Sequence, residues 1–178
     1  SRFLSRTVRN QPAESFSVNP QPAYRQTWRD RGLALLIPGY HEKAIDYLNR
    51  AIVLTPKLPE VWHGRGDALA NLSRYEDALA SLNQALELAP DRHETWTFRA
   101  VVLIHLERYQ EALESCEQAL TLEPGDQEAR LFRGVALQRM GQFKAAYAAY
   151  NSALEIHRKP LGWQIWEPLK ALFSGWKS

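Results

Sequence analysis

The sequence predicts an all-α fold, in which four helical hairpins stack into a solenoid and a further helix follows at the C-terminal end. Three observations support this prediction. Similar residues recur at intervals of 34 residues, each interval contains two stretches with the apolar spacing of amphipathic helices, and turn or breaker residues separate the stretches. A chain of 178 residues with 45% hydrophobic and 24% charged residues suits one domain or one repeat array.

Several columns of the sequence keep the same 34-residue spacing. One column is tryptophan, three are small residues, and proline closes three of the four units. The columns are Trp28, Trp62 and Trp96; Gly32, Gly66, Ala100 and Gly134; Ala44, Ala78, Ala112 and Ala146; Ala51, Ala85, Ala119 and Ala153; and Pro56, Pro90 and Pro124. Chance does not explain so many columns in one register, so an internal repeat dominates the sequence.

Each unit reads as two helices joined by a short turn. In the second unit, apolar side chains recur at helical spacing over residues 61–72 and again over residues 75–88. The turn between them lies near residues 71–74, and its counterparts lie at residues 38–39, 106–108 and 141–142. Small side chains let two helices approach closely, so we expect the column of Gly66 to meet the column of Ala78 across each hairpin. Proline ends three of the four second helices because it cannot extend them.

These columns resemble the tetratricopeptide repeat, whose 34-residue pattern has Trp, Gly, Ala, Ala and Pro among its fixed positions. The units that fit the pattern begin at Arg25, Pro59, His93 and Gln127. The stretch from Trp62 to Leu69 is similar to arrays common in bacteria, including cyanobacteria. The resemblance implies a right-handed superhelix whose concave wall is lined by the first helix of each unit.

The chain departs from the family pattern at several positions. One column, where the family often has leucine, holds Arg31, Arg65, Arg99 and Arg133. The last unit has Arg130 in place of tryptophan and Arg158 in place of proline, and the first unit has His41 in an aromatic column. The resemblance is specific for the fold and says little about the function.

The pattern divides the chain into an arm, an array and a tail. Residues 1–24 are polar and proline-rich, and we expect a flexible arm there, with folding on a partner or across the array as the alternative. The four units occupy residues 25–58, 59–92, 93–126 and 127–158. Residues 159–178 form the tail.

The tail is rich in tryptophan. It contains Trp163, and Trp166, Phe173 and Trp176 recur at helical spacing. We expect a helix that caps the apolar end of the last hairpin. Docking to another subunit and contact with a membrane surface are the alternatives.

No motif for catalysis, a metal or a cofactor is present in the sequence. The five histidines are not paired at helical spacing, and no glycine-rich phosphate loop follows a strand. Cys116 is the single cysteine, and we expect it to be buried on the apolar side of a helix as a small hydrophobic residue. We therefore expect no enzyme, no cofactor and no metal site.

Charge and hydropathy narrow the class of partner. The formal net charge is +2 and no basic stripe is visible, which argues against nucleic acid. The apolar run at residues 33–38 is the longest, far shorter than the roughly 20 residues that a membrane span requires. We expect a protein or peptide partner and a cytoplasmic location, with the cytoplasmic face of a membrane as the alternative. Self-association and membership of a longer chain stay open.

The resemblance places a candidate binding site on the concave wall. The side chains expected there mix apolar and polar groups: Arg29, Leu33, His63, Asp67, Asn71, Thr97, Val101, Ile104, His105, Leu131, Val135 and Arg139. The apolar groups would favour burial of a ligand, and the polar groups would fix its register. Packing within the array is the alternative role for each of them.

The same wall lacks the cations of a chaperone-tail receptor. Receptors of that kind in the family hold a C-terminal carboxylate with Lys, Asn and Arg, whereas this chain offers Arg29 alone and places Asp67 where it would repel a carboxylate. The function we expect is a noncatalytic scaffold, adaptor or assembly factor that binds a peptide or helix in the groove. The alternative is a structural or assembly subunit of a larger, membrane-associated complex, docked through the tail and the arm.

Overall fold

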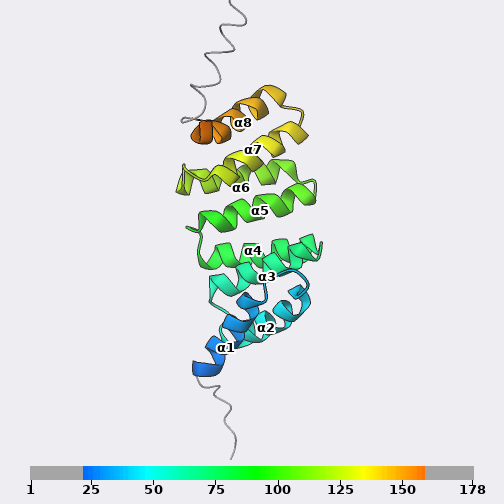
Figure 1. Ribbon diagram of the computed structural model, residues 1–178, viewed down its shortest axis with the longest axis vertical. Coiled ribbons are helices and arrows are strands. Elements are labelled where there is room, and N and C mark those ends of the chain that lie inside the picture. The colour runs from blue at the N-terminus through cyan, green and yellow to red at the C-terminus, as the bar shows by residue number, and fades with distance from the viewer. Residues whose placement is uncertain (1–21, 159–178) are drawn as a thin grey trace, which may run out of the picture.

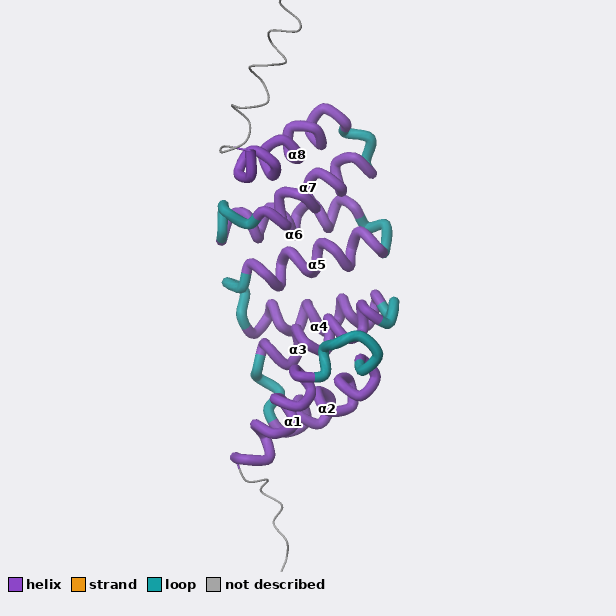
Figure 2. The backbone as a smooth tube through the Cα atoms, viewed as in Figure 1, coloured by secondary structure: helices purple, strands orange, loops and turns teal. Residues whose placement is uncertain are grey.

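The computed structural model describes residues 22–158, with side chains described for residues 27–154. Within this range the chain forms eight α-helices and no strand (Figure 1). They are α1 (Pro22–Ala34), α2 (His41–Leu54), α3 (Pro59–Asn71), α4 (Tyr75–Leu88), α5 (His93–His105), α6 (Tyr109–Leu122), α7 (Gln127–Arg139) and α8 (Phe143–Arg158). Consecutive helices pair as hairpins, and each second helix packs on the first helix of the next hairpin (Figure 2). The fold is the all-α solenoid that the repeat predicts.

The first hairpin differs from the others at both ends of α1. The helix begins at Pro22, so residues 22–24 of the expected arm are helical; proline fits the first turn of a helix because its missing N–H has no partner there. The linker to α2 spans residues 35–40, whereas the other hairpins use three residues. Pro38 disfavours helical backbone before it, and Gly39 closes the linker with φ +86°. The rest of the expected arm and the whole tail lie outside the described residues.

The other three hairpin turns share one geometry. Ser73 and Glu107 adopt φ +59° and Gly141 adopts φ +76°, in the left-handed region. In each turn the next amide donates a hydrogen bond of 2.9 Å to the carbonyl five residues earlier. This bond satisfies a carbonyl that the helix end leaves free. It compensates for placing the non-glycine residues Ser73 and Glu107 in a conformation that glycine adopts more easily.

Three hairpins pack a glycine of the first helix against a large side chain of the second. The pairs are Gly32 with Leu48, Gly66 with Leu82 and Gly134 with Tyr150. A Cβ added at Gly66 would lie 2.9 Å from Leu82 Cγ, closer than carbon atoms pack. Gly66 does meet Ala78, whose carbonyl oxygen would lie 3.3 Å from such a Cβ, but the side chain that covers Gly66 belongs to Leu82, four residues later.

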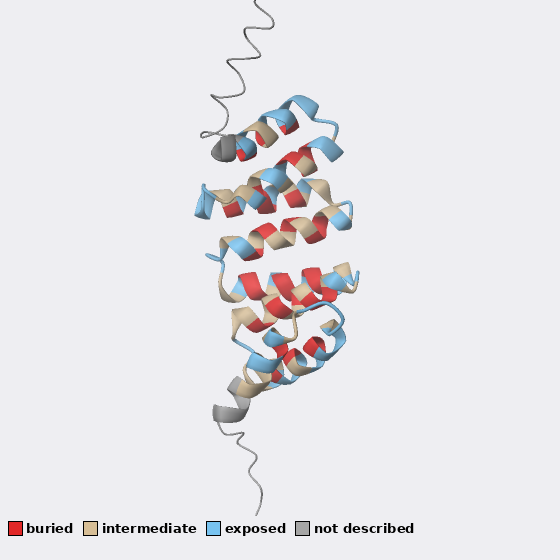
Figure 3. Cartoon of the chain, in the orientation of Figure 1, coloured by how far each residue is buried: buried red, intermediate tan, exposed pale blue. Residues whose placement is uncertain are grey.

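The third hairpin has a larger residue on the first helix and a smaller one on the second helix at the equivalent positions. Ala100 replaces the glycine, and Cys116 stands where the other hairpins have leucine or tyrosine. Both side chains are fully buried in the same core cluster, in line with the buried residues that run along the facing sides of the helices (Figure 3). The burial of Cys116 confirms the prediction for that residue.

Two arginines of the unusual column tie neighbouring hairpins together. Each donates one hydrogen bond to an asparagine of the preceding unit and one to a serine of its own unit. The bonds are Arg65 Nε to Asn49 Oδ1 (2.7 Å), Arg65 Nη1 to Ser81 Oγ (2.6 Å), Arg99 Nε to Asn83 Oδ1 (2.7 Å) and Arg99 Nη1 to Ser115 Oγ (2.5 Å). Because Ser81 and Ser115 are buried, the guanidinium also satisfies hydroxyls that lack water. The arginine column therefore has a structural role that the family's leucine does not supply.

A second set of bonds closes the junctions between units. The indoles of Trp62 and Trp96 donate through Nε1 to the carbonyl oxygens of Pro56 (2.8 Å) and Pro90 (2.9 Å), each six residues earlier. Arg130 stands in the same column and donates through Nη2 to the carbonyl oxygen of Pro124. The last unit thus keeps the hydrogen bond although it lacks the tryptophan.

Candidate protein-binding groove

The first helices of the hairpins lie on one side of the array and approach one another there. α1 contacts α3 and α5 contacts α7 directly, in addition to the contacts that each makes with second helices. α3 and α5 are in looser contact than these two pairs. The line between α3 and α5, which we call the α3/α5 seam, is the least closed part of this wall.

One end of the seam opens into a hollow of about 550 Å³, which we call the Glu60 hollow. It is lined by Leu33, Leu36, Glu60, His63, Gly64 and residues 91–95. A Cβ at Gly64 would lie 2.7 Å from Leu33 Cδ2, so the missing side chain lets α1 reach α3 and form the floor. Leu33 and His63 of the expected groove therefore lie together here.

Charges of both signs surround the Glu60 hollow. The Glu60 carboxylate lies 3.9 Å from Arg29 Nη1 and 4.0 Å from Arg92 Nη2. Asp91 and Glu94 add two more carboxylates to the lining. Arg29, the one suitable cation among the expected clamp positions, is thus already paired with a carboxylate.

His63 occupies the middle of the seam. Its Nδ1 shares a hydrogen bond of 2.9 Å with the buried Thr95 hydroxyl, and its ring packs 5.7 Å from that of Phe98. Burial lowers the pKa of His63, more than the nearby Asp67 carboxylate raises it. The ring is therefore neutral at pH 7 and is held by α5, so it presents a fixed, partly apolar surface.

The other end of the seam is a hollow of about 350 Å³, which we call the His105 hollow. Its lining is Ala70, Asn71, Ser73, Tyr75, Phe98, Val101, Val102 and His105. The rings of Tyr75 and His105 stack with centroids 4.5 Å apart and an interplanar angle of 3°. These rings, with Val101 and Phe98, form the apolar part of a recess of mixed polarity, and that part suits one aliphatic or aromatic side chain.

Asn71 of α3 lines the His105 hollow and is hydrogen-bonded to Asp67, one helical turn away. Asn71 Nδ2 donates to Asp67 Oδ1 at 2.7 Å and to the Asp67 carbonyl at 2.9 Å. The amide oxygen of Asn71 and the second carboxylate oxygen of Asp67 have no hydrogen bond within the described residues. Both oxygens can accept from the backbone N–H groups of a bound segment.

Thr97 does not belong to an accessible wall. Its side chain is 4% exposed, and its hydroxyl lies 2.7 Å from Asp126 Oδ2 and 3.1 Å from the His93 carbonyl oxygen. Asp126 Oδ1 accepts from the Ala129 amide at 2.9 Å and caps α7. Thr97 therefore fastens α5 to the start of α7, which is the packing role that the sequence left as an alternative.

The remaining expected groove residues are separated from the two hollows. Leu131, which is 43% exposed, lies on α7 with Val135 and Arg139, and no α7 residue lines either hollow. Ile104 is partly buried against the main core cluster.

Two aromatic residues of the seam escaped the sequence reasoning. Phe98 was missed because the groove positions were taken from the family pattern, which does not include it, and Tyr75 because it begins a second helix. The available signal was the contrast in one column between Gly64 and Phe98, which gives α5 a large ring at the position where α3 has no side chain.

Three further features of the described residues concern metal binding, thiol chemistry and membrane spans. No group of three or more His, Cys, Asp or Glu side chains among them is arranged to hold a metal ion. Burial raises the pKa of the Cys116 thiol to about 12, so it remains protonated and unreactive. Of the helices in the described range, none has both the length and the apolar character to cross a bilayer.

Comparison with known proteins identifies the repeat. Two family models, both described as tetratricopeptide repeat, match residues 63–127 and 103–165. No curated protein sequence matches the chain.

Solved structures resemble the array over most of its length. The chain is similar to a crystal structure of MamA, with a TM-score of 0.74 and 22% identity over 79% of this chain and 82% of that chain. MamA from Desulfovibrio magneticus RS-1 has a TM-score of 0.69 and 26% identity over 74% and 75% of the two chains. YrrB, described as a tetratricopeptide repeat protein with an unusual peptide-binding site, has a TM-score of 0.65 and 22% identity over 75% and 68%. The family models, the repeated columns and the stacked hairpins together show that the chain is a tetratricopeptide repeat protein.

Proposed function

We propose that this chain is a noncatalytic scaffold that binds an extended segment of another protein along the α3/α5 seam. The observation that carries the proposal is the pair of hollows at opposite ends of two parallel-running first helices. Each helix has 13 residues, which corresponds to about 20 Å at 1.5 Å per residue. An extended segment of about six residues covers that length at roughly 3.3 Å per residue.

The lining of the seam favours a ligand with an apolar anchor and a free backbone. The His105 hollow accepts one apolar side chain, and Asn71 and Asp67 present acceptor oxygens beside it. At the other end the carboxylates of Glu60, Asp91 and Glu94 outnumber the guanidinium groups, so a basic or hydroxyl-bearing side chain fits there better than an acidic one. Among the similar structures, YrrB is described as having a peptide-binding site, which supports a peptide ligand for this array as well.

A peptide selection tests this proposal. A displayed library of random peptides is selected on the full chain, and the selected peptides are measured against Val101→Glu, which places a charge in the His105 hollow. Val53→Glu is the matched control, because Val53 is 81% exposed on α2 and the substitution adds the same charge away from the seam. We expect Val101→Glu to weaken binding at least tenfold and Val53→Glu to leave it unchanged.

The selection also has a result that contradicts the proposal. Peptides that bind the wild type and Val101→Glu with equal affinity would place recognition outside the seam. Circular dichroism and the thermal midpoint of both variants show that each one is folded before binding is compared. The selected sequences test the chemistry separately, since an excess of acidic residues would contradict the charge argument.

A further inference from the structure

The segment that precedes α1 has the chemistry that the α3/α5 seam favours in a ligand. Residues 2–9, which we call the arm segment, read RFLSRTVR. In an extended chain successive side chains point to opposite sides, so Phe3, Ser5, Thr7 and Arg9 share one side. This side has an aromatic group at one end, a guanidinium group at the other and two hydroxyls between them.

The spacing of these side chains matches the seam. Phe3 and Arg9 are six residues apart, which is about 20 Å at roughly 3.3 Å per residue, and the seam has the same length of about 20 Å. The Phe3 ring can therefore enter the apolar part of the His105 hollow while the Arg9 guanidinium reaches the Glu60 hollow. Between them, the Ser5 and Thr7 hydroxyls face the part of the seam where one carboxylate oxygen of Asp67 has no hydrogen bond within the described residues.

Charge also favours this segment. The expected arm contains three arginines and one acidic residue. The lining of the Glu60 hollow has the carboxylates of Glu60, Asp91 and Glu94 and the guanidinium of Arg92. Arg29 adds a second guanidinium beside the hollow, so carboxylates still exceed guanidinium groups there. An arginine of the arm segment is therefore attracted to this end of the seam.

The attachment point of the arm lies close enough for the segment to fold back onto the seam. α1 begins at Pro22, and Leu33, which lines the Glu60 hollow, lies 11 residues further along this helix, a distance of about 17 Å. Residues 10–21 supply up to about 40 Å of extended chain. Because Arg9 is nearer to this attachment than Phe3, the connection brings Arg9 to the Glu60 hollow and leaves Phe3 for the farther His105 hollow.

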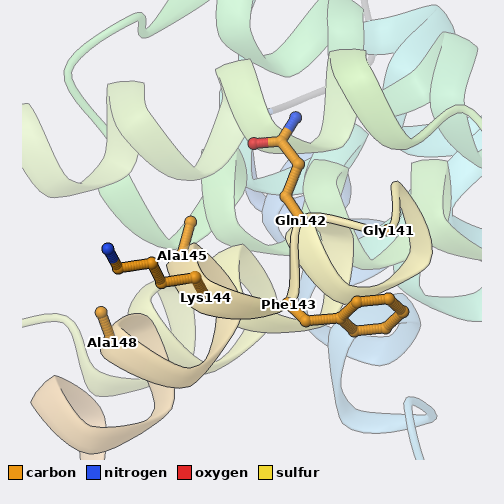
Figure 4. Close-up of a pocket in the computed structure, with 6 residues that line it drawn as sticks. All are labelled: Gly141, Gln142, Phe143, Lys144, Ala145 and Ala148. Carbon is orange, nitrogen blue, oxygen red and sulfur yellow. The ribbon is translucent and has the colours of Figure 1, made fainter.

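A shallow hollow at the start of α8 suits the arm segment less well. It measures about 680 Å³ and is lined by Gly141, Gln142, Phe143, Lys144, Ala145 and Ala148 (Figure 4). The charged side chain of this lining is Lys144, which repels an arginine, and α8 lies at the opposite end of the array from α1 (Figure 1). The seam therefore offers the arm segment both the better charge and the shorter connection.

We propose that residues 2–9 bind along the α3/α5 seam of their own chain, with Phe3 in the His105 hollow and Arg9 in the Glu60 hollow, so that a partner has to displace them. The inference rests on the proposed function, because it takes the seam as the binding site. The connection holds the arm segment at an effective concentration of about one millimolar, which a second copy at micromolar concentration does not match. If the segment alone dissociates with a constant of about 100 µM, a competing ligand binds about tenfold more weakly.

Competition by a synthetic peptide tests this occupancy. The probe is a labelled peptide of residues 1–12, and fluorescence anisotropy measures its binding to the wild type and to an arm variant, the full chain with Phe3→Ser and Arg9→Glu. We expect the peptide to bind the arm variant about tenfold more tightly than the wild type, because the seam of the variant is open. Adding Val101→Glu to the arm variant should abolish binding, whereas adding Val53→Glu, on α2, should leave it unchanged. Equal binding to the wild type and the arm variant would overturn the proposal.

Two substituted peptides test the register. Arg9→Glu and Arg6→Glu change the charge of the peptide equally, but Arg6 lies on the opposite side of the extended segment. We expect Arg9→Glu to weaken binding to the arm variant at least fivefold more than Arg6→Glu does. Equal losses would mean that overall charge attracts the arm without the proposed register, which contradicts the proposal.

Disulfide trapping locates the segment in the full chain. Ser5→Cys is combined with Ala70→Cys, in the lining of the His105 hollow, or with Val53→Cys as the matched control, while the buried Cys116 stays in place. We expect an intramolecular disulfide with Ala70→Cys in much higher yield than with Val53→Cys, identified by mass spectrometry. Equal yields at the two positions, or disulfides that form solely between chains, would overturn the proposal.

These outcomes differ from those expected if the proposed function fails. If the peptide of residues 1–12 does not bind the arm variant, while a library-selected peptide binds it and loses affinity with Val101→Glu, the inference about the arm is wrong and the seam remains the binding site. If no peptide depends on Val101, both proposals are wrong.

Discussion

A pair of residues 16 positions apart sets how closely the two helices of each hairpin approach. In the first, second and fourth hairpins this pair is glycine with leucine or tyrosine. In the third hairpin it is Ala100 with Cys116, and both are buried. In each pair, a small residue on the first helix is matched to a residue on the second helix whose size suits it. Because the interior is close-packed, changing one member alone leaves either an overlap or a void.

The third hairpin gives a direct test of this size exchange. We expect Cys116→Leu to lower the free energy of unfolding by about 1–3 kcal/mol, because the added carbons meet the Ala100 methyl group. Adding Ala100→Gly should recover part of the loss, since the double variant recreates the pair of Gly66 and Leu82. Urea unfolding of the wild type, both single variants and the double variant gives the coupling. A double variant less stable than Cys116→Leu would contradict the size argument.

The pair of His93 and Asp126 makes the junction between α5 and α7 sensitive to pH. The hydrogen bond of 2.9 Å to Asp126 is the main cause that raises the pKa of His93. For Asp126, burial raises the pKa, but bonds from the Ala129 amide, Thr97 and His93 outweigh it and lower the pKa overall. Because the pKa of His93 is raised in the folded protein, His93 contributes stability. This contribution is complete below the ordinary pKa of 6.5 and is lost as the pH rises through the raised pKa. The stability that Asp126 contributes is present above its ordinary pKa of 3.8 and is lost as the pH falls through its lowered pKa.

The contribution of His93 makes the stability of the protein depend on pH, and this can be measured. We expect His93→Gln to reduce the free energy of unfolding by about 0.5–1 kcal/mol more at about pH 5.5 than at about pH 8.5. Comparing variant with wild type at each pH cancels the opposite contribution of His63, whose pKa burial lowers. Equal differences at the two values would show that the bond to Asp126 does not depend on the charge of the ring.

At the scale of the helices, the junctions between units depend on polar bonds as well as on apolar packing. Arg65 joins α3 to α2 and α4, and Trp62 joins α3 to the end of the preceding unit. The equivalent bonds recur at Arg99 and Trp96. Arg31 and Arg133 form no hydrogen bond or ion pair within the described residues, because α1 follows no described unit and Ala149 replaces the serine beside α7.

The arginine column can be tested by comparing two of its members. Arg65→Leu restores the family's usual residue but leaves the buried Ser81 hydroxyl without its guanidinium partner, so we expect a loss of about 1–3 kcal/mol. Arg133→Leu makes the same chemical change where no such bonds exist and should cost less than about 0.5 kcal/mol. Thermal unfolding monitored by circular dichroism measures both. Equal losses would mean that the column stabilises through packing alone.

The positions of the hairpins could be predicted from the sequence, whereas contacts between distant residues could not. The repeat columns locate the hairpins because each column has a local cause, such as the breaker Pro56 or a turn residue. The same register predicts the helix in the first unit to run past Leu36, whereas Pro38 ends it earlier. Of the expected groove residues, Asn71, Val101 and His105 line one hollow and His63 lines the other. The burial of Thr97 involves Asp126, 29 residues away, which no local pattern reveals.

At the scale of the whole molecule, the stability of each hairpin depends on its packing against the neighbouring hairpins. α3 to α6 are packed on both sides, whereas α1 and α8 have a neighbouring hairpin on one side within the described residues. Hydrogen exchange should therefore be slowest in the amides of α3 to α6 and faster in α1 and α8, because an end hairpin separates from one neighbour when it opens and a central hairpin from two. Mass spectrometry after peptic digestion resolves these helices. Slowest exchange in α1 would contradict a stability built from nearest neighbours.

The bonds at the junctions have a consequence for how the array gains or loses length. The pair of Gly134 and Tyr150 lies inside one unit, while the bonds of Arg65 and Arg130 reach backward into the preceding unit. If a genetic deletion removed residues 93–126, Arg130 would follow Pro90 at the same interval at which it now follows Pro124. The ends of the second and third units therefore match at this bond, so duplication or loss of such a unit would change the length of the scaffold and keep this junction bond.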